Sequence, residues 1–202
     1  MNTPSFSRRT VLAAALITPL LAACGDQKPQ AKAPEFLGTD ITGANIGKDL
    51  AMIDTQGTQR SLNDFKGKVT VFFFGFTQCP DVCPTAMAEL AQALNLLEAD
   101  AANVQVVMIS VDPERDTQEI LRQYVQTFNP SFIGLTGTPD QLAATARSFK
   151  AYYAKVPGSQ PGQYSMDHAS SFYVFDANAE ARVLVSGSAG AQSIAADIRQ
   201  LL

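Results

Sequence analysis

Three side chains in this sequence could carry chemistry together, namely two cysteines in one short loop and a single histidine. Cys79 and Cys83 stand in the segment GFTQCPDVCPT, residues 75–85, and His168 is the only histidine among 202 residues. Two thiols in one loop can form a reversible disulfide or bind a soft metal ion such as Cu(I) as thiolates. The residue types therefore leave three interpretations open: a redox disulfide, a metal site, or both.

The spacing of the cysteines bears on that choice. Thioredoxin-type oxidoreductases use a C-x-x-C motif, whereas three residues separate the thiols here. The oxidoreductase interpretation is weakened by this difference without being excluded. An imidazole would complete a three-coordinate copper site, and only His168 can supply one. A lone histidine is nevertheless more often a surface or core residue without a ligand role.

The pattern around this loop places both cysteines at the edge of a predicted sheet. Residues 69–76 read VTVFFFGF, a continuous apolar run typical of a strand that is buried on both faces. Pro84 suits the first turn of a helix, and apolar residues recur at spacings of three and four over residues 87–97. We therefore expect Cys83 at or near a helix N-cap, where free backbone N–H groups favour a thiolate.

The remaining pattern predicts an α/β protein in which helices flank a mixed central sheet. Strands are expected at residues 69–76, 104–111, 132–135, 172–175 and 183–185, and helices after Pro84, after a capping pair at Asp116 and Glu119, from Thr138, and over residues 193–202. Parallel strands come first and an antiparallel pair comes last, which is the thioredoxin-like arrangement with an insertion. Sites in such sheets lie at the carboxyl ends of parallel strands. A loop at residues 157–163 is expected before His168, which itself lies in the loop that precedes the fourth predicted strand.

The N-terminal segment is typical of a targeting signal. Arg8 and Arg9 precede a 13-residue apolar run, which is too short to cross a bilayer as a helix but has the length of a signal-peptide core. The run ends at Leu-Ala-Ala-Cys, residues 21–24, which resembles a lipobox and makes Cys24 the expected lipidation site. The paired arginines also resemble a twin-arginine signal, so the export route stays open.

This interpretation divides the chain into three parts. Residues 1–23 are the expected lipoprotein signal peptide, residues 24–48 a polar tether, and residues 49–202 one thioredoxin-like domain. The mature protein is expected in the bacterial cell envelope, anchored to a membrane by its lipid and facing the periplasmic side. Lipidation would leave Cys79 and Cys83 as the free thiols. The net charge of −4 and the lack of a basic stripe disfavour nucleic acid as a partner.

Several sequence blocks resemble the signatures of the Sco/SenC family. They are GFTQCPDVCPT at 75–85, SVDPERDT at 110–117 and MDHASSFYVFD at 166–176, and residues 41–68 also fit. Sco/SenC proteins are membrane-anchored copper-binding proteins with a thioredoxin-like fold. They deliver copper to the dinuclear copper site of cytochrome c oxidase, or reduce the thiols of that site.

The resemblance implies a function and a ligand set. Cys79, Cys83 and His168 would hold one copper ion per domain, as Cu(I), Cu(II) or both. The protein would then be a copper chaperone of oxidase assembly rather than an enzyme. The implied partners are the apo copper-site subunit of the oxidase, an upstream copper donor, and the membrane that holds the anchor. Two alternatives use the same cysteines: an extracytoplasmic thiol-disulfide oxidoreductase and a redox sensor.

Residues near the implied ligands carry smaller expectations. Asp167 is at most an orienting or electrostatic neighbour of the histidine. Ala169 stands where the family commonly has Ser or Thr, which removes a hydroxyl that could support the ligand set. We interpret Asp112 and Arg115 as a strand-ending Asp-Pro turn with a nearby cap, and Met166 as a loop or packing methionine rather than a spare ligand.

Overall fold

The two central strands form because their residues are apolar almost without interruption. β4 (Val69–Gly75) and β5 (Val104–Ser110) pair in parallel along their whole length, and every residue of β4 is buried. Successive side chains of a strand point to opposite faces, so an unbroken apolar run requires protein on both sides. The expectation of a doubly buried strand is confirmed. The structure, a computed structural model, describes residues 35–202. The predicted signal peptide and Cys24 lie outside the described residues.

Eight strands of the described chain make one mixed sheet. Along the chain they are β1 (Thr39–Asp40), β2 (Ala51–Asp54), β3 (Gln59–Ser61), β4, β5, β6 (Ile133–Thr136), β9 (Phe172–Phe175) and β10 (Ala181–Val185). Across the sheet the order is β1-β10-β9-β4-β5-β6-β2-β3. β4, β5 and β6 run parallel, and β9 and β10 continue the sheet antiparallel on the other side of β4. The predicted thioredoxin-like fold with a mixed sheet is confirmed, and the short strands β1, β2 and β3 add to it.

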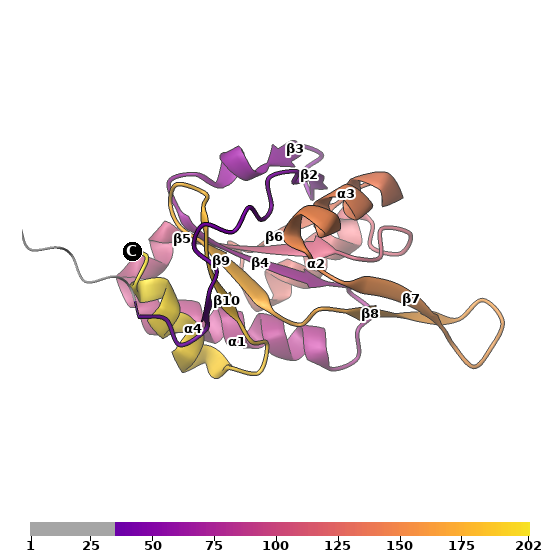
Figure 1. The fold of residues 1–202 in the computed structure, drawn as a ribbon. Coiled ribbons are helices and arrows are strands. Elements are labelled where there is room, and N and C mark those ends of the chain that lie inside the picture. The colour runs from indigo at the N-terminus through magenta and orange to yellow at the C-terminus, as the bar shows by residue number, and fades with distance from the viewer. Residues whose placement is uncertain (1–34) are drawn as a thin grey trace, which may run out of the picture. The chain divides into compact units, whose positions relative to one another are not determined.

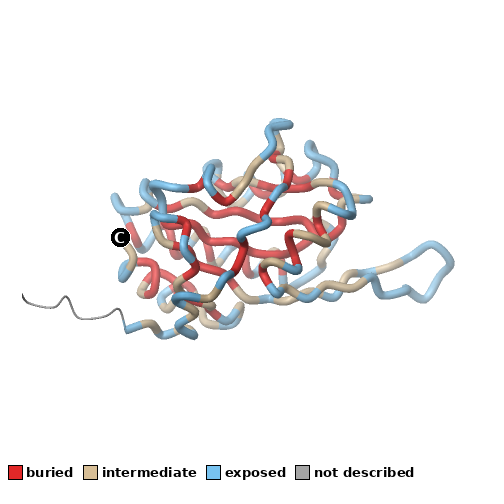
Figure 2. The backbone as a smooth tube through the Cα atoms, turned by 45° about the horizontal axis from the view of Figure 1, so that its top comes forward, coloured by how far each residue is buried: buried red, intermediate tan, exposed pale blue. Residues whose placement is uncertain are grey.

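Helices cover both faces of this sheet. They are α1 (Val82–Leu97), α2 (Gln118–Phe128), α3 (Pro139–Phe149) and α4 (Gly190–Arg199), with 3-10 turns η1 (Leu62–Phe65) and η2 (Glu98–Asn103). α1 and α4 pack together on one face, and α3 lies on the other (Figure 1). Phe72 and Phe74 both pack edge-on against Phe149 of α3, with ring centroids 5.3 Å apart in each pair. Figure 2 shows the buried backbone running through the sheet between these layers.

The helix starts depend on local capping, which the sequence predicts in one case and not in the other. Thr138 and Gln141 form a reciprocal capping box at the start of α3, as expected. At the start of α2 the cap is Thr117, whose Oγ1 accepts a hydrogen bond from the N–H of Ile120 at 3.3 Å. Asp116 is therefore not the capping residue, and its side chain is fully buried instead. The last helix begins at residue 190 and ends at 199, earlier than predicted at both ends.

A separate hairpin projects from the body of the domain (Figure 1). β7 (Tyr153–Pro157) and β8 (Tyr164–His168) pair antiparallel, and a short exposed turn joins them. The predicted loop at 157–163 covers that turn, but His168 is the last residue of a strand rather than part of a loop. The hairpin was missed because its strands mix polar and apolar residues and are flanked by Gly and Pro, which are typical of loops.

The described part of the predicted tether belongs to the folded domain. β1 pairs with β10 and Ile46 is buried. The backbone N–H groups of Leu37 and Gly38 donate hydrogen bonds to the Asp197 carboxylate at 2.6 and 2.9 Å. Residues 35–48 thus contribute to the sheet and to the core. Their polar composition does not reveal this, because so short a strand is identified by the strand with which it pairs.

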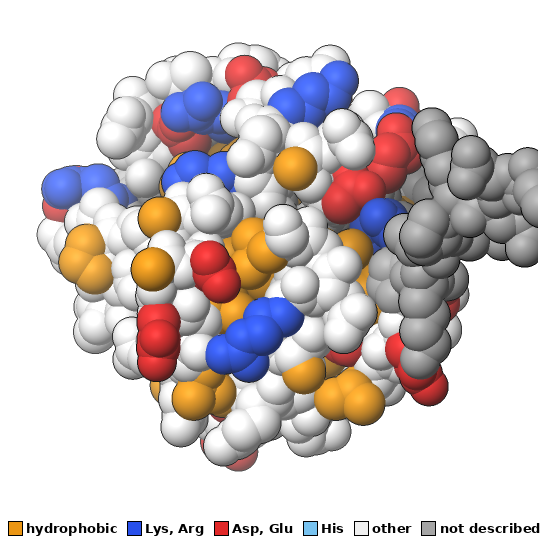
Figure 3. Space-filling view, turned by 90° about the vertical axis from the view of Figure 1, so that its left-hand side faces the viewer, with side chains coloured by type: hydrophobic (Ala, Val, Ile, Leu, Met, Phe, Trp, Pro, Cys, Tyr) orange, Lys and Arg blue, Asp and Glu red, His pale blue; other side chains and the backbone are white. Residues whose placement is uncertain are grey.

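Charges of both signs are mixed on the end of the domain opposite the hairpin. Figure 3 shows lysine and arginine side chains interspersed with aspartate and glutamate on this face, where the described residues form no continuous basic surface. Within residues 35–202, no helix combines the length and the apolar character that a membrane span requires.

Candidate metal centre

The three candidate ligands come together at one place in the fold. Cys79 and Cys83 follow β4 at the start of α1, and His168 ends β8. Their two sulfur atoms and one imidazole nitrogen all lie within 4.8 Å of one another, and Cys83 Sγ is 3.3 Å from His168 Nε2. Two thiols and an imidazole within reach of one ion are a donor set that suits soft or borderline metals, copper among them.

The start of α1 sets the positions of the two sulfur atoms. Asp81 is the N-cap residue, so Cys83 is the second residue of the helix rather than its cap. The backbone N–H of Cys83 donates to Cys79 Sγ at 3.4 Å, which directs a free donor of the helix end toward the more exposed sulfur. Gly75 makes room for the inner sulfur, because a Cβ at this position would lie 3.1 Å from Cys83 Sγ.

The two cysteines differ in their exposure. Cys79 is half-buried and Cys83 is completely buried. Burial raises the pKa of the Cys83 thiol, so the expectation of an environment that favours its thiolate is wrong for the metal-free chain. The loss of hydration outweighs a backbone hydrogen bond of Phe76, which lowers the pKa of this thiol. A bound metal ion would reverse this balance, because its positive charge stabilises the thiolate and a coordinating thiol is therefore deprotonated.

Aromatic rings and one backbone carbonyl hold the imidazole of His168. The rings of Phe73 and Phe76 pack edge-on against it, with centroid separations of 5.9 and 5.8 Å. Nδ1 lies 3.0 Å from the carbonyl oxygen of Ala169. Since a carbonyl can only accept, Nδ1 carries the proton and Nε2 presents its lone pair toward Cys83.

The residues beside His168 support it through the backbone and through packing. Asp167 is exposed on β8, and the acceptor that orients the imidazole is the carbonyl of Ala169. Support for the ring therefore comes from the backbone, which does not require a hydroxyl at position 169. The N–H of Ala169 donates to the carbonyl of Tyr152 at 3.0 Å and ties the end of β8 to the start of β7. Met166 is half-buried and packs against the core.

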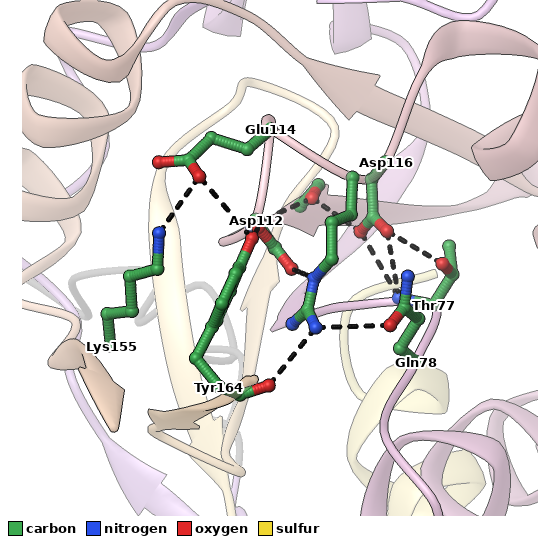
Figure 4. A network of polar contacts seen from close by, with 9 residues as sticks. Thr77, Gln78, Asp112, Glu114, Asp116, Lys155 and Tyr164 are labelled. Atoms are coloured by element: carbon green, nitrogen blue, oxygen red, sulfur yellow. Dashed lines mark hydrogen bonds and ion pairs between the residues drawn. The ribbon is translucent and has the colours of Figure 1, made fainter. Parts of the chain in front are cut away.

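A polar network beside the cysteine loop was not expected from the sequence (Figure 4). Nη1 of Arg115 donates to the side-chain oxygen of Gln78 and to the backbone carbonyl of Tyr164, each at 3.1 Å. Nε of Arg115 pairs with the carboxylate of Asp112, and the Tyr164 hydroxyl donates to the same carboxylate at 2.9 Å. Burial and this hydrogen bond raise the pKa of Tyr164 to about 12, so its hydroxyl remains a donor.

The network corrects the interpretation of Asp112 and Arg115 as a turn with a cap. The turn exists, since the N–H of Arg115 donates to the carbonyl of Asp112 at 3.1 Å. The side chains do more, because they connect the loop that carries Cys79 with the strand that carries His168. The signal in the sequence was the block at residues 110–117, which resembles a Sco/SenC signature and holds four charged residues.

A buried carboxylate supports the other side of the cysteine loop. Asp116 accepts hydrogen bonds from the Thr77 N–H at 3.1 Å, from the Thr77 hydroxyl at 2.6 Å and from the Ser110 hydroxyl at 2.6 Å. Burial raises the pKa of Asp116, and these three donors oppose that shift. Thr77 stands two residues before Cys79, so Asp116 fixes the backbone where it enters the loop.

Comparison with known proteins gives the family. A family model described as SCO1/SenC matches residues 38–202. The chain belongs to the SCO1/SenC family. A SCO2-like protein of Rickettsia felis is 38% identical to it over 134 residues, which are 66% of this chain and 65% of that relative. The match thus spans just under two thirds of the length of this SCO1/SenC relative.

Solved SCO1/SenC structures share the fold. A structure of Bradyrhizobium japonicum ScoI with copper bound is 34% identical, with a TM-score of 0.70, and the match covers 82% of this chain and 99% of that one. The apo Sco1 protein of Thermus thermophilus is 36% identical, with a TM-score of 0.74, over 83% of this chain and 98% of that one. The mixed sheet and its flanking helices are therefore those of SCO1/SenC proteins.

Proposed function

We propose that this SCO1/SenC chain carries copper and delivers it to the dinuclear copper site of cytochrome c oxidase during assembly. The observation that carries the proposal is the cluster of Cys79, Cys83 and His168, whose ligand atoms lie within 4.8 Å of one another. One copper ion would be held there. The thiolates would contribute most of the binding of Cu(I), and the imidazole would contribute more to the binding of Cu(II). The copper-bound Bradyrhizobium structure supports the choice of metal.

The geometry suits a carrier because the ion would lie close to the surface with few ligands. Cys79 is half-buried, and Pro80 and Val82 beside it are exposed. A thiolate of the apo oxidase subunit could approach from this side and bind the ion before the carrier's own ligands leave. Copper would then pass by exchange of ligands, without a change of oxidation state and without release into solution. An upstream donor would load the site by the same steps in reverse.

The unequal exposure of the cysteines favours a second candidate function, reduction of a disulfide in the acceptor. The half-buried Cys79 would attack a partner sulfur as a thiolate, and the partner's other sulfur would leave as a thiolate that takes up a proton. Cys83 would then attack Cys79 and release the second partner thiol. The partner disulfide gains two electrons, and the carrier is left with a Cys79–Cys83 disulfide. A redox sensor would use the same bond without passing metal or electrons to a partner.

Titration of the reduced chain with copper tests the principal function. We expect saturation at one ion per chain, followed by transfer to an apo copper-site subunit of an oxidase with reduced cysteines. The readout is the copper content of the separated proteins together with the visible absorption of the acceptor's filled site. A reduced chain that binds no copper, or that keeps it in the presence of an excess of acceptor, would contradict delivery.

We also propose that the chain works at the periplasmic side of a bacterial membrane, held there by a lipid on Cys24. The support is the segment Leu-Ala-Ala-Cys at residues 21–24 after a short apolar run. Cys24→Ser is expected to leave the protein unprocessed or to release it from the membrane, without a change in the fold of residues 35–202.

Membrane fractionation and electrophoretic mobility in the producing cells measure this effect. Cys79→Ser is the matched control, because it removes a thiol by the same substitution and should leave membrane retention unchanged. The proposed lipid anchor would be contradicted if Cys24→Ser showed the same membrane retention and mobility as the unmodified sequence.

A further inference from the structure

Arg115 contacts three segments of the candidate site, namely its own loop, the cysteine loop and β8. Its side chain is 22% exposed and pairs with Asp112 in its own loop. The same guanidinium donates to Gln78, the residue before Cys79, and to the backbone of Tyr164, the first residue of β8. One planar cation therefore joins the cysteine loop to the strand that ends in the histidine.

The contacts at Tyr164 determine how β8 is oriented. The guanidinium carbon of Arg115 lies 3.7 Å from the centroid of the Tyr164 ring, and Nζ of Lys155 lies 3.8 Å from it. In a strand, residues at i, i+2 and i+4 share one face. Tyr164, Met166 and His168 are the half-buried residues of β8, and the two between them are exposed. Holding Tyr164 toward the domain therefore also turns the imidazole toward the cysteines.

A second contact path leads from Arg115 to the imidazole through Phe76. The guanidinium carbon lies 5.9 Å from the centroid of the Phe76 ring, and that ring packs edge-on against His168 at 5.8 Å. Arg115 thus touches both the ring that supports the imidazole and the strand that carries it. Lysine could not replace it, because a point charge on a flexible stem lacks the planar fork that makes several such contacts at once.

We propose that Arg115 is a positioning residue for His168, which holds the imidazole within reach of the two cysteine sulfurs. The inference rests on the copper site proposed above. It adds a residue that determines how much the imidazole contributes to copper binding. Loss of Arg115 frees the end of β8 next to the hairpin turn, where Tyr164 pairs with Pro157, and the strand can then turn His168 away from the site. The cysteine pair stays in place, because Asp116 and the start of α1 hold it independently.

The first test needs no metal. His168 is the only histidine, so an untagged chain gives one set of imidazole ring signals in an NMR spectrum. In Arg115→Gln we expect these signals to move toward those of a free histidine and the Nδ1 proton to exchange faster with water. Arg122→Gln is the matched control, since Arg122 also pairs with a carboxylate three residues before it but lies on α2, with a side chain that is 43% exposed. Unchanged His168 signals in Arg115→Gln would overturn the proposal.

The second test is a double-mutant cycle with copper on the full chain. Arg115→Gln is expected to weaken Cu(II) binding by about tenfold or more, as loss of a residue that orients a ligand does, and to leave Cu(I) binding unchanged. Adding Arg115→Gln to His168→Ala should weaken Cu(II) binding no further, because the arginine acts only through the imidazole. Additive losses in the double variant would refute the positioning role.

Two further outcomes keep this inference separate from the proposed function. If Arg115→Gln does not fold, as judged by circular dichroism, Tyr164→Phe removes only the hydroxyl bonded to Asp112 and should shift the His168 signals in the same direction to a smaller extent. Unshifted signals in a folded Tyr164→Phe would then count against the proposal. If His168→Ala leaves Cu(II) binding unchanged, the copper site is wrong, and the metal-free NMR test still decides whether Arg115 positions the histidine.

Discussion

Replacing His168 with alanine should weaken Cu(II) binding by about 100-fold or more and Cu(I) binding much less, which separates a copper carrier from a dithiol enzyme. Cu(II) is the harder ion and depends on the imidazole, whereas two thiolates alone can hold Cu(I). The chain has no second histidine that could take over. Affinities for both oxidation states, the Cu(II) absorption spectrum and a thiol-exchange assay on the same variant measure the difference.

Ser165→Ala is a suitable control for this experiment, because Ser165 lies on the same strand but on its exposed side. It should bind copper as the unmodified chain does. Thiol exchange should survive His168→Ala, since that reaction needs the cysteines and little else. Normal binding of both copper states and normal oxidase assembly in the His168 variant would remove the histidine from the ligand set. The oxidoreductase alternative would then be the better account of the cysteine pair.

Oxidation of the cysteine pair is expected to abolish Cu(I) binding completely. Cys79 and Cys83 already share one turn of chain, with a backbone N–H of one donating to the sulfur of the other. A small movement brings the sulfurs to bonding distance, and the disulfide that forms has no thiolate left to bind metal. Mass spectrometry and thiol titration report the disulfide, and Cu(I) titration before and after reduction reports the site.

Cys83→Ser provides the control for the redox experiment. This variant cannot form the disulfide and has lost one sulfur ligand, so its Cu(I) affinity should be low and insensitive to oxidant. The serine hydroxyl would also be buried at a completely enclosed position, so a lower unfolding temperature is expected for it than for Cys79→Ser. Tight, stoichiometric Cu(I) binding by the oxidised chain would contradict both cysteines as ligands.

The features of this protein that could be predicted are those that local sequence pattern controls. The buried strand at residues 69–76 was predictable because an unbroken apolar run leaves few alternatives, and the cap at Thr138 because its partner Gln141 lies three residues away. The three candidate ligands could be named because the blocks that contain them resemble Sco/SenC signatures, while residue type alone left a redox disulfide and a metal site both open. Such features depend on residues that are close in the sequence, so they can be predicted without knowledge of the fold.

How those ligands are held depends on tertiary packing, which local pattern does not describe. The burial that raises the pKa of Cys83 comes from the packing of whole elements, which the position of this residue near a helix start does not reveal. Cys83 and His168 approach each other across 85 positions of the chain, and Arg115 reaches Tyr164 across 49. Periodicity and capping rules describe separations of two to four residues. Cys83 and His168 meet because β8 leads into β9, which runs antiparallel beside β4, so the residues before β9 lie next to those that follow β4.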